Sequence, residues 1–110
     1  MDLINELSRL TTLLNEAIRQ LGKRGAEYAA AERNYRVELR KEILIERDAK
    51  TPVTIISDVC RGKEEIATLK FKRDCAEVMY DSAKEAINAY KLQMRLLDEQ
   101  ISREWGAIKE

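Results

Sequence analysis

The chain has 110 residues, of which 20 are Lys or Arg and 20 are Asp or Glu, so its formal net charge is zero. Four glycines and one proline are too few turn formers for a many-stranded sheet, which argues against an all-β fold. The chain has no histidine and only two cysteines, Cys60 and Cys75, which argues against a histidine base, a His/Cys metal site and a disulfide framework. We therefore expect an all-α single domain over residues 1–110 that is not an enzyme and carries no cofactor or metal.

The apolar residues do not form a membrane span or a leader. No uninterrupted apolar run approaches the roughly 18 residues that a transmembrane helix needs, and the N-terminus lacks the basic-then-apolar layout of a signal peptide. We expect a cytoplasmic protein with reduced thiols and no membrane partner.

The N-terminal half of the chain has heptad spacing. Its apolar residues recur alternately four and three apart, at Leu3, Leu7, Leu10, Leu14, Ala17 and Leu21. Each of Gly22 and Gly25 costs about 1 kcal/mol in a helix interior relative to alanine. Because Tyr28, Ala31 and Tyr35 continue the same rows beyond these glycines, the pattern predicts one helix over residues 2–50, with fraying at Gly22 to Gly25 left open.

A second heptad run predicts a helix over residues 63–108. Its seam is formed by Ile66, Leu69, Arg73, Ala76, Tyr80, Ala83, Ile87, Tyr90, Met94, Leu97 and Ile101. Residues 51–62 then form a connector, for which Thr51 followed by Pro52 predicts a helix start and Arg61 followed by Gly62 predicts a helix end. A short helical turn is favoured there over a strand, because a lone strand would have no partner.

Two such helices predict an antiparallel, coiled-coil-like hairpin. In an antiparallel pair of helices, the numbers of two facing residues add to a constant. A constant of 111 centres the bend on the connector and places Tyr80 opposite Ala31. The same constant places Glu38 opposite Arg73 inside the seam, where a charged pair would fix the register. An arginine that faces a ligand, or one that reaches solvent past its neighbours, is the alternative interpretation.

The apolar surface is wider than one hairpin needs. Beside the seam of the second helix lies another apolar row, formed by Phe71, Cys75, Val78, Ala89, Leu92 and Leu96. This row predicts self-association into a helical-bundle homo-oligomer, of which a dimeric four-helix bundle is the simplest form.

Two groups of residues are candidates for binding an anion. The first is an arginine row on one side of the first helix, formed by Arg33, Arg36, Arg40 and Arg47, for which a solvated charged face is the alternative. The second is the connector with Thr54, Ser57, Arg61 and Lys63, for which a hydrophobic plug formed by Ile55, Ile56 and Val59 is the alternative. Neither half of the chain is a basic arm, so nucleic-acid binding is not favoured.

Five short segments give the chain a resemblance to a known group of proteins: Pro52–Asp58, Arg61–Gly62, Arg73–Asp74, Ala86–Asn88 and Arg103–Trp105. With them the chain resembles short, uncharacterised helical proteins encoded by prophages and temperate phages of Gram-positive bacteria. The resemblance implies a phage setting in a host bacterial cytoplasm, without site residues to carry over. Small phage proteins of this kind often act by binding.

Together these features predict a non-enzymatic, oligomeric binding protein that counters host defence. It would either inhibit a host defence protein or sequester a phosphate-bearing signalling nucleotide between protomers. A structural or accessory scaffold of phage replication or assembly is the alternative.

Overall fold

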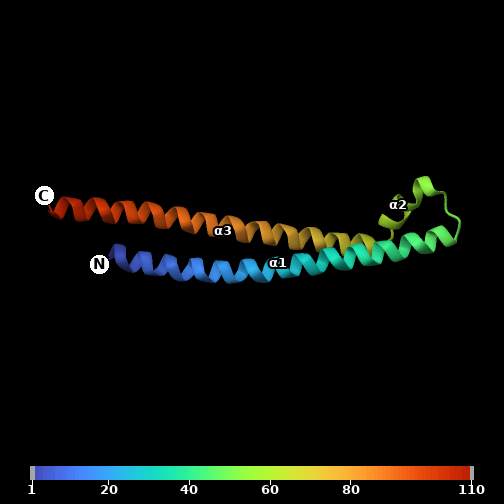
Figure 1. The fold of residues 1–110 in the computed structure, drawn as a ribbon, viewed down its shortest axis with the longest axis horizontal. Coiled ribbons are helices and arrows are strands. Elements are labelled where there is room, and N and C mark those ends of the chain that lie inside the picture. The colour runs from blue at the N-terminus through green and yellow to red at the C-terminus, as the bar shows by residue number, and fades with distance from the viewer. Residues whose placement is uncertain (1, 110) are drawn as a thin grey trace. The chain divides into compact units, whose positions relative to one another are not determined.

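The computed structural model describes the backbone of residues 2–109 and the side chains of residues 2–107. Within this range the regular elements are three helices: α1 (Asp2–Asp48), α2 (Val53–Arg61) and α3 (Glu64–Lys109) (Figure 1). The expected all-α class, with two long helices and a short helical connector, is confirmed. The ends differ slightly from expectation, since α1 stops two residues before residue 50 and α3 begins one residue after residue 63.

The helix α1 continues without a break through both of its glycines. A Cβ atom at Gly25 would lie 3.2 Å from Cε1 of Tyr80, so this glycine leaves room for the Tyr80 ring of α3 against the backbone of α1. The same ring packs on Tyr28, with ring centroids 5.9 Å apart and planes tilted by 34°. A large side chain therefore does meet a small one here, but the small residue is Gly25 and not Ala31.

The turn after α1 is closed by a left-handed residue that is not glycine. Lys50 has a φ of 63°, its N–H donates to the carbonyl of Arg47, and the N–H of Thr51 donates to the carbonyl of Glu46. This is the pattern of a Schellman motif. It turns Thr51 back onto α1, where its hydroxyl donates to Oε2 of Glu46 at 2.5 Å.

The expected N-cap at Thr51 is therefore wrong by one residue, although α2 begins at Val53 as expected. The N-cap of α2 is Pro52, which makes no capping hydrogen bond through its side chain. The expected end of α2 is confirmed, because α2 stops at Arg61 and the N–H of Gly62 donates to the carbonyl of Asp58 at 3.1 Å.

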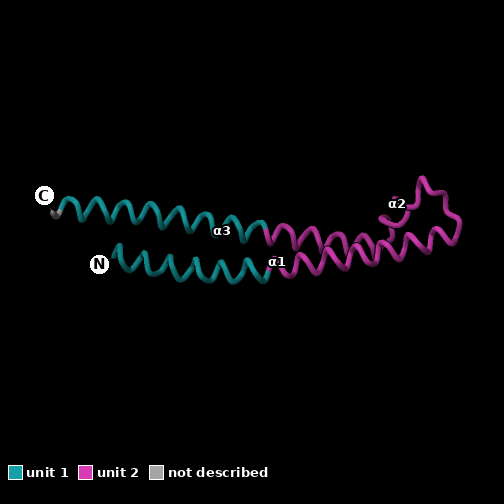
Figure 2. The backbone as a smooth tube through the Cα atoms, in the orientation of Figure 1, with its two compact units in different colours: residues 1–23, 81–110 teal, residues 24–80 magenta. Residues whose placement is uncertain are grey.

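The chain divides into two compact units (Figure 2). Unit 1 contains residues 1–23 and 81–110, so that within it the beginning of α1 runs antiparallel to the end of α3. Leu10 and Ile87 are its buried apolar side chains among the described residues. The number of buried residues is small because, in a pair of helices, each helix buries only the side chains that face the other helix.

Unit 2 contains residues 24–80: the rest of α1, all of α2 and the beginning of α3. Its core is larger, since Tyr35, Ile56, Cys60 and Ile66 are all buried. Figure 1 shows why: α2 folds back beside the last turns of α1 and supplies a third helix there. Of the three residues of the hydrophobic plug foreseen for the connector, Ile56 is buried, together with Cys60, whereas Ile55 and Val59 are exposed.

The helix register in unit 2 differs from the expected one. Three cross-helix contacts, Tyr28 with Glu77, Glu32 with Arg73 and Glu42 with Lys63, each have residue numbers that add to 105. Two further contacts, Glu46 with Lys63 and Tyr28 with Tyr80, add to 109 and 108, so the constant of 111 is too high by two to six residues, at most close to one heptad. Sliding one helix by a heptad returns the same apolar stripe to the seam, so the apolar pattern fits both registers.

The expected Glu38–Arg73 pair is wrong for the same reason. Glu38 accepts a hydrogen bond from Lys41 on its own helix at 3.1 Å, and Arg73 pairs with Glu32 instead. Centring the bend on the connector assumed that both helices end level with each other. Instead α1 continues past the level at which α3 begins, and α2 packs beside this overhang.

Candidate anion-binding groove

One hollow of unit 2, which we call the cationic groove, gathers positive side chains from all three helices. It has a volume of about 290 Å³ and is lined by Glu32, Tyr35, Arg36, Leu39, Arg61, Lys70 and Arg73. Four of these side chains are cationic and one is a carboxylate, and Asp74 and Glu77 beside the lining pair with two of the cations. Tyr35 and Leu39 supply the apolar part of the lining.

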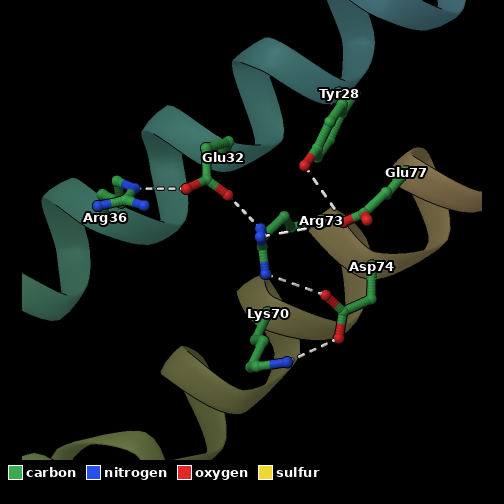
Figure 3. A network of polar contacts seen from close by, with 7 residues as sticks. All are labelled: Tyr28, Glu32, Arg36, Lys70, Arg73, Asp74 and Glu77. Atoms are coloured by element: carbon green, nitrogen blue, oxygen red, sulfur yellow. Dashed lines mark hydrogen bonds and ion pairs between the residues drawn. The ribbon is translucent and has the colours of Figure 1, made fainter. Parts of the chain in front are cut away.

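Arg73 is the most deeply placed cation of the groove and is held on several sides (Figure 3). Its side chain is only 24% exposed, and its Nε pairs with Oε2 of Glu32 across the two long helices. Its two terminal nitrogens approach Asp74 at 3.2 Å and Glu77 at 3.9 Å. Burial works to lower the pKa of Arg73, and the hydrogen bond and charge of Glu32 outweigh it, so the guanidinium stays charged.

Glu32 is shared between two arginines. Its other oxygen, Oε1, accepts a hydrogen bond from Nε of Arg36, which lies one turn further along α1. The hydrogen bond from Arg36, and then that from Arg73, hold the pKa of the Glu32 carboxyl below its ordinary value. One carboxylate thus fixes two guanidiniums at the groove, and the exposed Arg36 side chain keeps donors that face solvent.

The remaining two cations come from α3 and α2. Lys70 pairs with Asp74 at 2.8 Å, one turn further along α3, and is about half exposed. Arg61 is exposed at the last residue of α2 and has no ion pair among the described side chains. Arg61 is therefore the cation of the groove with the least competition from the protein's own carboxylates.

Lys63 has a different role from the one its sequence position suggests. Its ammonium group binds Glu42 at 2.7 Å and Glu46 at 2.8 Å, and so fastens the α2–α3 turn to α1. These two hydrogen bonds raise the pKa of Lys63, and the bonds from Lys63 and Thr51 lower the pKa of Glu46. We call this cluster the Lys63 clamp.

The structure brings together part of the set proposed from the sequence. Arg36 and Arg61, which came from two separate candidate groups, line the same groove. The others lie outside its lining: Arg33, Arg40, Thr54 and Ser57 are exposed, and Lys63 belongs to the clamp.

Sequence reasoning missed Lys70 and favoured a seam position for Arg73, with an arginine that faces a ligand as an alternative. Lys70 and Arg73 are three residues apart on α3 and so share a helix face. That spacing was the available signal. In the observed structure this face of α3 lies beside Arg36 in the groove.

Comparison with protein-family models, with curated proteins and with solved structures yields no match. Among the described residues, no helix is both long and apolar enough to cross a membrane. Nor do His, Cys, Asp and Glu side chains of the described part gather into a metal-binding group. The case for a function therefore depends on the geometry of the groove and on the exposed apolar surface.

Proposed function

We propose that the chain is a non-enzymatic binding protein that holds a small phosphate-bearing ligand. The observation that carries the proposal is the cationic groove, in which Arg36, Arg61, Lys70 and Arg73 converge from three helices on one hollow. Arginine is suited to this task because its planar guanidinium donates two parallel hydrogen bonds to a phosphate. Asp74 and Glu77 beside the groove pair with Lys70 and Arg73, so Arg36 and Arg61 are the cations most open to an anionic ligand.

In the phage setting that the resemblance implies, such a protein counters host defence by sequestering a signalling nucleotide. Holding a ligand requires neither a general base nor a nucleophile, in keeping with a chain that contains no histidine. Inhibition of a host defence protein by direct contact belongs to the same class of action, and the exposed apolar side chains are the surface it would use. Both modes act in the host cytoplasm.

Calorimetry with a panel of linear and cyclic nucleotides tests the proposal. We expect at least one of them to release heat, and Arg36→Gln to weaken its affinity roughly ten- to hundredfold, because a hydrogen bond to a charged group contributes about 1.5–3 kcal/mol. Arg33→Gln is the matched control, since Arg33 is an exposed arginine of the same helix outside the groove. The absence of heat with every nucleotide would contradict the proposal.

Self-association is the second part of the proposed function, and the exposed apolar side chains of α3 support it. In unit 2, Phe71 is 68% exposed and Val78 is 62% exposed. In unit 1, Leu92 and Leu96 are 50% and 55% exposed. These residues belong to the apolar row expected from the sequence, and the chain does not cover them itself. Apolar side chains at heptad spacing are typical of a surface that another helix covers.

The same surface favours a second candidate function, a scaffold in which the assembly is itself the product. Native mass spectrometry of the purified protein is expected to show a closed oligomer, and Phe71→Ser with Val78→Ser to shift it to the monomer. Ile45→Ser is the control, because Ile45 is exposed on α1 and the residues seven positions before and after it, Glu38 and Pro52, do not extend an apolar row. A scaffold would co-purify with phage proteins, whereas a counter-defence protein would co-purify with host ones. A monomer at micromolar concentration would refute the self-association.

A further inference from the structure

The cationic groove is shared by three helices, and one of them is short. Arg36 comes from α1, Arg61 from α2, and Lys70 and Arg73 from α3. Resting on the proposed function, we infer that the ligand is a phosphomonoester of mononucleotide size and that its binding fastens α2 to the two long helices. The phosphate would contact Arg61 together with a cation of α1 or α3.

The size and lining of the groove define the ligand class. Pockets for drug-sized molecules have volumes of about 300–1,000 Å³, and this groove, at about 290 Å³, is at the lower limit. It holds one phosphate with one small organic group, so a cyclic dinucleotide would need the groove of a second copy as well. The dianionic charge of a phosphomonoester matches several convergent cations, and Tyr35 and Leu39 offer an apolar surface to the organic group.

The helix α2 has few contacts that fasten it in place. It has nine residues, fewer than the roughly 12–15 that an isolated helix needs to be stable, so its structure depends on packing. The contacts that hold it are the buried side chains of Ile56 and Cys60 and, at the turn that follows, the Lys63 clamp. Val53 is 83% exposed and Ile55 is 46% exposed, so much of the apolar surface of α2 does not contribute.

A ligand that contacts Arg61 only when α2 is docked stabilises the docked state by mass action. At ten times its dissociation constant, such a ligand lowers the population of the open state about elevenfold. The thiol of Cys60 reports that population, because it is fully buried in the docked state and becomes reactive only when α2 opens. Burial also raises the pKa of this thiol, which keeps it protonated while α2 is docked.

The experiment measures the alkylation of each cysteine by N-ethylmaleimide in the intact protein, with the two peptides resolved by mass spectrometry. Adenosine monophosphate at ten times its measured dissociation constant is expected to slow the reaction of Cys60 about tenfold. The exposed Cys75 is the internal control, and its rate should be the same with and without the ligand. Inorganic phosphate at the same concentration should protect Cys60 less than adenosine monophosphate does. Equal protection would overturn the inference that the ligand carries an organic group that binds in the groove.

Two variants locate the effect. Arg61→Gln should abolish the protection of Cys60, and Arg40→Gln, which removes an exposed arginine of α1 outside the groove, should preserve it. Protection that survives Arg61→Gln would overturn the inference. If adenosine monophosphate releases heat on binding but the alkylation rate of Cys60 does not change, the inference is overturned and the proposed function stands. If no nucleotide releases heat, the proposed function itself is contradicted.

Discussion

Replacing Ile66 with alanine is expected to destabilise the chain by about 3 kcal/mol, within the 2–5 kcal/mol typical of a buried isoleucine. Ile66 is 2% exposed and lies in the first turn of α3, immediately after the turn that joins it to α2. With Ile56 and Cys60 it forms half of the six buried apolar residues among the described side chains. A small core of this kind has few residues that can move into a cavity, so we expect the loss to exceed the lower limit of that range.

The matched control is Ile45→Ala, the same substitution in another helix. Ile45 is 55% exposed, so its truncation removes little buried surface, and we expect a loss of less than about 1 kcal/mol. Urea unfolding measures both variants, and the midpoint should fall for Ile66→Ala with an unchanged slope. Equal losses would show that the α2–α3 turn does not contain the core of unit 2.

The sequence contained enough information to predict the helices but not their register. Heptad spacing alone predicted that α1 continues through Gly22 and Gly25, and it predicted which row of α3 stays exposed. The register depended on how the connector folds, and a heptad pattern is unchanged by a shift of one heptad. The left-handed Lys50, which directs the chain back along α1, has no distinctive sequence signal, because glycine is the usual residue there.

The candidate site shows the same division between local and non-local information. Arg36 and Arg61 were identified from local patterns, an arginine row and a helix end, without any indication that they meet. Their convergence depends on α2 folding back beside α1, which is a tertiary event. The clamp role of Lys63 was not foreseen because its two partners, Glu42 and Glu46, lie 21 and 17 positions away in the sequence, and neither pairing is a local pattern.

Exchanging the charges of Glu32 and Arg73 tests this register directly. Arg73→Glu alone places a fourth carboxylate beside Glu32, Asp74 and Glu77, so we expect it to lower the thermal midpoint more than any other single charge reversal. Glu32→Arg alone brings together three cations. The double exchange restores one opposed pair and should recover part of the loss, as a favourable coupling in a double-mutant cycle. Recovery will be incomplete, because the introduced carboxylate still faces Asp74 and Glu77.

The control is the exchange of Glu38 with Arg73, the pair that a constant of 111 would bring together. In the structure Glu38 pairs with Lys41 on its own helix and is not a partner of Arg73, so the two reversals should simply add. Thermal unfolding followed by circular dichroism measures all five variants.

Rescue by the Glu38 exchange without rescue by the Glu32 exchange would show that the helices are shifted by one heptad. It would also move Lys70 away from the level of Arg36, and the cationic groove would then lack one of its cations. The stability cycle is therefore also a test of the binding site, because the register that pairs Glu32 with Arg73 is the one that forms the groove.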